Sequence, residues 1–90
     1  MNAHDGWMPR LNDTLRIQRV AGESILLDTA SERVHQLNEV GTFILDRCDG
    51  TRTVSRIVAD IIEQYDVPDG TATRDATEML DTLKTLGIVV

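Results

Sequence analysis

The chain has 90 residues, of which 41% are hydrophobic and 27% are charged, and its formal net charge is −6. This length supports one small domain, and the apolar content is too high for a disordered chain. The negative charge argues against nucleic acid as a main partner, because phosphate backbones are bound by clustered Lys and Arg side chains. A solvated acidic surface is the simpler meaning of the charge.

The N-terminus and the cysteine content suggest a cellular location. No apolar run approaches the roughly 20 residues that cross a bilayer, and residues 1–10 lack the features of a signal peptide. A single cysteine cannot form an internal disulfide. We therefore expect a cytoplasmic protein without membrane contact. Residues 1–8 are expected to form a flexible tail before one domain at 9–90, although Trp7 could instead pin the tail to the body.

The first part of the chain has the pattern of a β-meander. Leu15 and Ile17 alternate with polar residues, which is the period of a half-buried strand. Ala21-Gly22 and Thr29-Ala30-Ser31 are turn sequences, and such short links favour antiparallel neighbours. We predict strands over 14–20, 23–28 and 32–37, with the third at an edge of the sheet.

The central segment predicts a first helix over 39–48. Asn38 precedes it and can accept a hydrogen bond from an N–H group of the first turn. Its apolar stripe is expected to contain Val40, Phe43, Ile44 and Cys48. Asp49-Gly50 is expected to stop the helix, because Gly readily takes the left-handed conformation of a C-terminal cap.

Two further helices are predicted after it. The second spans 53–65, with Thr53 as its cap, and has the strongest apolar periodicity of the chain. The third spans 72–86 and begins near Thr71 to Thr73, because the Pro and Gly of residues 66–70 break the pattern. Gly87 is expected to end it. The expected buried positions of the two helices are Val54, Ile57, Val58, Ile61, Ile62, Tyr65, Ala76, Leu80 and Leu83.

The residues give little support for catalysis. Cys48 lies on an apolar stripe, so an inert buried thiol is expected rather than an activated nucleophile. His4 and His35 have no second ligand at metal spacing, and no Gly-rich phosphate loop is present. We therefore predict a protein that is not an enzyme and that uses neither a metal nor a cofactor.

Two binding functions remain. Three strands and three helices also describe a winged-helix DNA-binding or regulatory interaction module, but the third helix carries net negative charge where base and phosphate contacts need Arg and Lys. The alternative is an exposed edge strand that accepts an extended peptide. The edge could also be merely protected by its charges, with Glu32 and Arg33 as gatekeepers.

Five short segments, in this order and spacing, resemble the PqqD-like family of peptide-binding chaperones, which includes the recognition elements of ribosomally made, post-translationally modified peptides (RiPPs). The resemblance covers roughly residues 9–90, and it implies an α+β fold that is winged-helix-like, with a three-stranded antiparallel sheet followed by a three-helix bundle. The segments are Ile25–Asp28 (ILLD), Leu37–Gly41 (LNEVG), Ile44–Gly50 (ILDRCDG), Thr53-Val54 (TV) and Leu80–Val89 (LDTLKTLGIV).

The resemblance also implies a function. Family members bind the leader segment of a precursor peptide as an added strand, against the third strand and beside the third helix. They deliver it to a modifying enzyme, such as a radical S-adenosylmethionine (radical SAM) protein, or to a leader peptidase, in the pathways of pyrroloquinoline quinone or lasso peptides. Which peptide and which enzyme apply here stays open, as does the oligomeric state, a homodimer included.

The peptide site is predicted between the third strand and the third helix. Met79 is the preferred apolar anchor, although plain core packing is an equal alternative. Asp75 would select peptides by charge, or would simply be well placed near the N-terminus of its helix. The predicted peptide-binding residues are Arg33, Val34, His35, Gln36 and Leu37 on the strand and Asp75, Met79, Thr82 and Leu86 on the helix.

Overall fold

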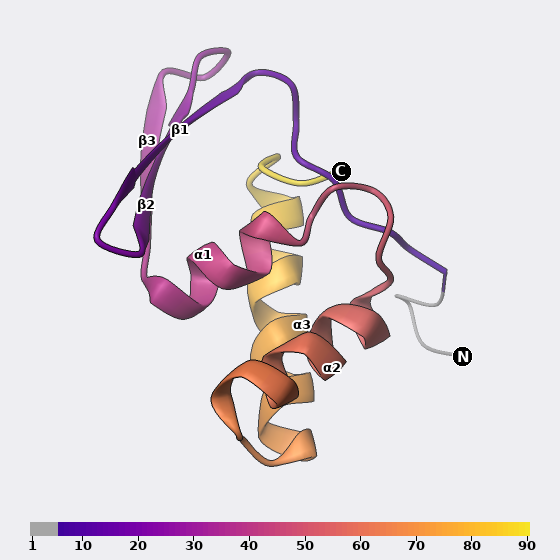
Figure 1. Cartoon of the computed structure of the whole chain (residues 1–90). Helices are drawn as coiled ribbons and strands as arrows, with labels where there is room; N and C mark the ends of the chain where they lie inside the picture. The colour runs from indigo at the N-terminus through magenta and orange to yellow at the C-terminus, as the bar shows by residue number, and fades with distance from the viewer. Residues whose placement is uncertain (1–5) are drawn as a thin grey trace.

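Three strands precede three helices along the chain, as predicted. The computed structural model describes residues 6–90. Figure 1 shows the sheet on one side of the molecule and the helices on the other. The elements are β1 (Leu15–Val20), β2 (Glu23–Asp28), β3 (Arg33–Leu37), α1 (Glu39–Asp46), α2 (Val54–Tyr65) and α3 (Asp69–Thr85).

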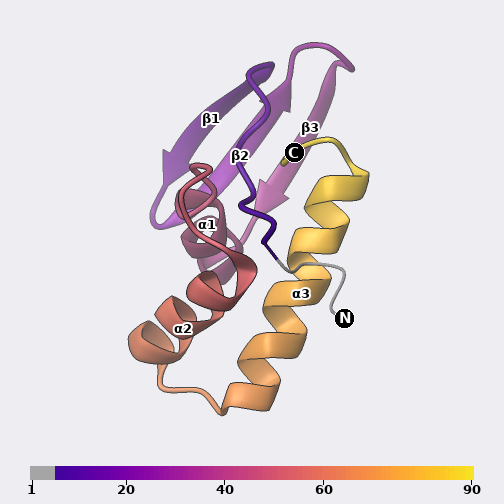
Figure 2. The same ribbon diagram turned by 90° about the vertical axis from the view of Figure 1, so that its right-hand side faces the viewer.

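The sheet is the predicted antiparallel meander, with the strand order β1-β2-β3. Residues alternate between its two faces, so that Leu26 is fully buried between Ile17 on β1 and His35 on β3. The opposite face is open, and there Leu27 pairs with Val34. β3 has a strand on one side only, and Figure 2 shows that β3, not β1, is the strand on the α3 side.

The core lies between the inner face of the sheet and the helices. Ile57 on α2 and Leu80 on α3 are fully buried, as the helical periodicity predicted. A buried hydrogen bond of 2.6 Å joins the hydroxyl groups of Ser24 on β2 and Thr42 on α1, which fixes the sheet to the helices. This bond ties β2 to α1, and the pairing of β2 with β3 ties the edge strand to the same helix.

The two ends of the described chain pair with each other. The N–H of Val90 donates to the carbonyl of Arg10 (2.8 Å), and the N–H of Arg10 donates to that of Val90 (3.1 Å). Gly87, with a φ of 78°, ends α3 as predicted, and this turn leads the chain back to residues 10–12. Trp7 is partly buried, and the Lys84 ammonium group lies 4.8 Å from the centre of its ring. His4 and the rest of residues 1–5 lie outside the described residues.

The predicted start of the third helix was wrong. α3 begins at Asp69 rather than near Thr71 to Thr73, and the N–H of Ala72 already donates to the carbonyl of Pro68. Pro68 is the N-cap residue, where its missing N–H is no disadvantage. Gly70 lies in the first turn, and the carboxylate of Asp69 favours the helix N-terminus.

The predicted end and stripe of the first helix also need correction. α1 ends at Asp46. The N–H of Cys48 still donates to the Leu45 carbonyl, but the Cys48 carbonyl accepts from the N–H of Leu11, and the N–H of Gly50 donates to the Pro9 carbonyl. Val40 is 37% exposed, whereas Leu45 is buried, since the face that packs on β2 is set by Thr42. The Asn38 cap is confirmed, and its side chain accepts from the N–H of Gly41 at 2.8 Å.

Candidate functional site

The β3 edge presents both an open face and a buried face. Val34 is 65% exposed and Gln36 is also exposed, whereas Leu37 is buried. His35 points to the inner face, where its Nε2 atom is buried and has no hydrogen-bond partner among residues 6–90. On the side away from β2, no strand of the described chain pairs with β3. The backbone of this edge can therefore pair with another extended chain.

A tight turn holds β3 at its first end. The Asp28 carboxylate accepts hydrogen bonds from the Thr14 hydroxyl (3.3 Å) and from the N–H groups of Ala30 (3.0 Å) and Ser31 (3.4 Å). Hydrogen bonding, from the Ser31 side chain above all, lowers the pKa of Asp28 against the opposing effect of burial. Glu32 completes the turn with a φ of 59°. The ionised carboxylate therefore organises the entry into the edge.

α3 lies on the β3 side of the sheet (Figure 2) and carries a hollow on its own surface. Four residues at helical spacing line a hollow of about 340 Å³: Asp75, Glu78, Met79 and Thr82. Three of them were predicted from the sequence, and Glu78 was missed although it lies one turn from Asp75. The structure therefore gathers Asp75, Met79 and Thr82 on one surface of α3.

Met79 connects this hollow to the end of β3. A Cβ placed on Gly41 would lie 3.4 Å from the Met79 Cε and 3.2 Å from the Leu37 Cβ. The absence of a side chain at Gly41 thus allows α3 to approach the junction between β3 and α1. Leu86 lies one residue past the end of α3 and is 38% exposed, and it does not line the hollow.

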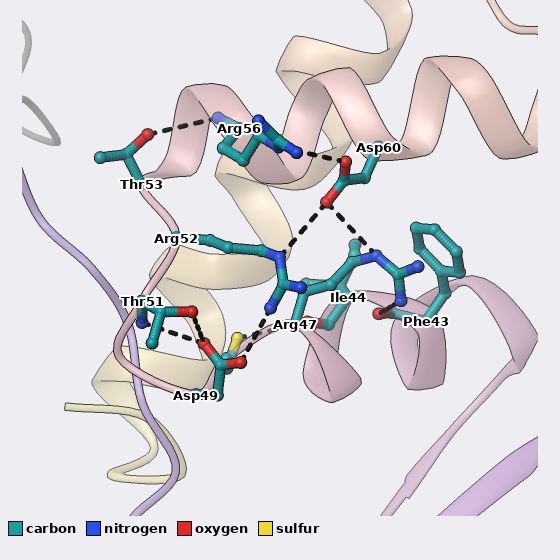
Figure 3. A network of polar contacts seen from close by, with 10 residues as sticks. Phe43, Ile44, Arg47, Asp49, Thr51, Arg52, Thr53, Arg56 and Asp60 are labelled. Atoms are coloured by element: carbon teal, nitrogen blue, oxygen red, sulfur yellow. Dashed lines mark hydrogen bonds and ion pairs between the residues drawn. The ribbon is translucent and has the colours of Figure 1, made fainter.

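The α1–α2 loop carries a polar network that lies away from the sheet (Figure 3). The Asp60 carboxylate on α2 receives Arg47 and Arg56, each at 3.5 Å, and Arg52 at 3.7 Å. The guanidinium group of Arg47 also lies 3.5 Å from the centre of the Phe43 ring. These contacts fasten the loop to both helices, so we assign the network a structural role.

The single cysteine is not set up for chemistry. Burial, with a smaller effect from the neighbouring Asp49 charge, raises the pKa of the Cys48 thiol to about 12. The thiol donates to the carbonyl of Ile44 at 3.3 Å. The pKa of Asp49 is lowered, chiefly by a hydrogen bond from the Thr51 hydroxyl. At neutral pH the thiol is therefore protonated and a poor nucleophile.

Within residues 6–90, no group of three His, Cys, Asp or Glu side chains is arranged to hold a metal ion. None of the helices described is long and apolar enough to cross a membrane.

Comparisons with known proteins agree with this architecture. A PqqA binding protein of Xanthomonas euvesicatoria pv. vesicatoria (strain 85-10) is 31% identical over 77 residues, which are 83% of this chain and 82% of that protein. Two solved structures share the fold. One is TbiB1 in complex with the TbiA(beta) leader peptide, with a TM-score of 0.81 and 22% identity over 89% of this chain and 93% of that one.

The second structure is lasso peptide synthetase B1 complexed with the leader peptide, with a TM-score of 0.81 and 23% identity over 92% of this chain and 98% of that one. The model of the family described as coenzyme PQQ synthesis protein D (PqqD) matches residues 23–89. The match begins at β2 and extends to the end of the core, so it includes the β3 edge and the α3 hollow. The chain therefore belongs to the PqqD family.

Proposed function

We propose that this protein binds the leader segment of a ribosomal precursor peptide as an added strand on β3, beside α3. The observation that carries the proposal is the free β3 edge, whose end meets the α3 hollow through Met79. The similar Xanthomonas protein is named for binding PqqA, and both similar structures are described as complexes with a leader peptide.

Strand addition divides affinity and specificity between the two elements. The peptide backbone would pair with the backbone of Arg33 to Leu37, which is independent of peptide sequence. Alternate peptide side chains would point toward α3, where the thioether of Met79 adapts to apolar groups of different shape. Thr82 would border the same hollow.

In the proposed role, the protein carries the leader peptide and does not catalyse a reaction. A protonated Cys48 thiol, shielded in the core, offers no nucleophile at neutral pH. The protein would hold the leader in the cytoplasm and deliver it to a modifying enzyme, either a radical SAM protein or a leader peptidase. The description of the PqqD family supports a role in pyrroloquinoline quinone synthesis. The similarity to lasso peptide synthetase B1 supports a role in lasso peptide synthesis.

Binding can be tested with two probes, the PqqA peptide and a peptide selected from a phage-displayed library of random 12-residue sequences. Backbone chemical-shift changes on addition of either peptide are expected at residues 33–37 and 75–82. Duplex DNA serves as the comparison and should bind weakly, because the charge of the chain is −6. Changes confined to α2, with β3 silent, would contradict the proposal.

The strand-addition mechanism has its own control. In an added strand, alternate peptide N–H groups point toward β3 and the others point away. Methylating the inward N–H groups of the selected peptide should therefore abolish binding. Methylating the outward groups changes the composition equally and should be tolerated. Equal sensitivity of the two sets would show that the peptide does not bind as a strand.

A further inference from the structure

The hydrogen-bond pattern of the sheet determines which backbone groups of β3 are free. Ala21 and Gly22, with φ values of 53° and 83°, form a two-residue turn of type I′, so Glu23 after the turn is hydrogen-bonded to β1. In the same way, the N–H of Thr29 donates to the carbonyl of Thr14, just before β1, at 3.1 Å. Bonded and non-bonded pairs alternate along an antiparallel ladder. The odd-numbered residues of β2 therefore bond to β1, and the even-numbered residues bond to β3.

The free backbone groups of β3 belong to Val34 and Gln36. The even-numbered residues of β2 pair with Arg33, His35 and Leu37, so the N–H and C=O groups of these three are used within the sheet. The groups of the two residues between them point to the open edge. A strand added to this edge therefore forms its hydrogen-bonded pairs with Val34 and Gln36, whose side chains lie on the open face of the sheet.

An apolar stripe crosses the open face of the sheet and ends at this edge. The strand register places Val20 on β1, Ile25 and Leu27 on β2 and Val34 on β3 on that face. Ile25 and Leu27 have a neighbouring strand on both sides and are each 39% exposed, whereas Val34 is 65% exposed. The high exposure of Val34 therefore arises from a missing neighbour at the edge, and an added strand would supply that neighbour.

Within β3, the side chains on the open face are uncharged. Edge strands are commonly protected by charged residues, but the two residues with free backbone groups are Val34 and Gln36. Arg33 lies on the other face, in register with Asp28. A second copy of the chain would bring a further net charge of −6, and the repulsion disfavours it as the occupant of the edge. The edge is therefore suited to a peptide that presents an apolar side chain.

From this arrangement we propose that the leader carries a β-branched or aromatic residue opposite Val34, with its side chain on the open face of the sheet. The inference rests on the proposed function, and it specifies the class of peptide. Side chains that lie directly opposite each other on neighbouring strands contact each other, and pairs of apolar β-branched or aromatic residues are stabilising. The leader is thus read on both faces of the sheet, opposite Val34 on the open face and by α3 on the other.

Two matched substitutions test the contact, with the library-selected peptide as the probe. Val34→Thr keeps the β-branched shape but replaces a methyl group by a hydroxyl group. Cross-strand pairs contribute about 0.2–1 kcal/mol, so Kd should increase by about 1.4- to 5-fold in isothermal titration. Val20→Thr makes the same change at an exposed position of the same face, where the backbone groups are bonded to β2, and should leave Kd unchanged. Circular dichroism verifies that both variants are folded.

A double-mutant cycle identifies the peptide residue opposite Val34. Nuclear Overhauser contacts to the Val34 methyl groups should come from one β-branched or aromatic peptide residue. Methylation of the backbone N–H of that residue should abolish binding, because this N–H points to β3. Replacing its side chain by Thr should weaken binding to the parent protein and have little further effect on Val34→Thr. The same replacement should keep its full effect on Val20→Thr.

The outcomes separate this inference from the proposed function. Equal Kd values for the two variants, or contacts to Val34 from a residue whose N-methylation is tolerated, would overturn the inference while shift changes at residues 33–37 still support strand addition. Shift changes of Val34 on concentrating the protein without peptide would assign the edge to a second copy and also overturn it. Shift changes confined to α2 would overturn the proposed function itself.

Discussion

The α2–α3 pair and the β3 edge differ in how much of their apolar and backbone surface is buried or paired. Ile57 and Leu80 are fully buried between the helices, whereas Val34 on β3 is 65% exposed and the backbone beside it pairs on one side only. Burial of apolar surface stabilises the helical part. Unpaired backbone N–H and C=O groups allow the β3 edge to bind another extended chain. Stability and recognition therefore reside in different elements, and substitutions should be able to separate them.

The largest effect is expected from the helical part. Ile57→Ala leaves a cavity in a fully buried position and should lower the free energy of unfolding by about 2–5 kcal/mol. Urea denaturation measures this loss, with the exposed Ser55→Ala as the control, expected within about 0.5 kcal/mol of the parent. The affinity of the folded fraction for peptide should be unchanged. A comparable loss of affinity in that fraction would mean that the two parts are not separate.

A pair of glycine substitutions tests where the two parts meet. Gly41→Ala introduces a Cβ 3.2 Å from that of Leu37, so the neighbouring atoms must shift by a few tenths of an ångström. This crowding should outweigh the gain in helix propensity of about 1 kcal/mol, and the net loss of stability should be up to about 2 kcal/mol. It should also weaken peptide binding by displacing Met79. Gly70→Ala has no atom within 4 Å of its new Cβ and should stabilise α3 by about 0.4–1 kcal/mol. Thermal melting distinguishes the two, and equal shifts in Tm would refute the close contact.

Replacing either of two helix caps should lower stability by a smaller amount, and only one of the two replacements should change peptide affinity. Asn38 and Thr53 accept hydrogen bonds from the first turns of α1 and α2, at 2.8 and 3.3 Å. Replacing either by Ala should cost about 1 kcal/mol in denaturant unfolding. Only Asn38 directly follows β3, so only Asn38→Ala should also weaken peptide binding. Isothermal titration would contradict this view if Thr53→Ala had the same effect on affinity.

The smallest expected effect is on the pH dependence of the free energy of unfolding. Because the pKa of Asp28 is lower in the folded chain, its contribution to stability is present above the unfolded pKa and is lost as pH falls through the folded value. Asp28→Asn should therefore reduce the loss of stability below about pH 4, the region of an unperturbed Asp. Unfolding midpoints at pH 5 and pH 2.5 measure the difference. An unchanged pH dependence in the variant would exclude this role for the turn.

Local signals account for the parts of the fold that the sequence predicted. The caps at Asn38 and Thr53 and the glycine at Gly87 act on their immediate neighbours, and all three were confirmed. The start of α3 was misjudged because Pro68 and Gly70 resemble a helix breaker in isolation. They are tolerated there because the first-turn N–H groups have no partner within the helix in any case.

The candidate site was less predictable, since it depends on how α3 lies against β3. Helical periodicity placed Asp75, Met79 and Thr82 on one face. It could not indicate that Met79 would meet Gly41, or that Glu78 would face the same hollow. Both depend on the tilt between a strand that ends at Leu37 and a helix that begins only at Asp69.

The pairing of the two chain ends has a mechanical consequence. Arg10 bonds to Val90, and the next bridge joins Leu11 to Val89 in antiparallel register. A force that draws residues 10 and 90 apart would load the Arg10–Val90 pair before the Leu11–Val89 pair, so these bonds would open in sequence. The pairing of the ends should therefore open at low force, while residues 9–11 stay bonded to Cys48 and Gly50.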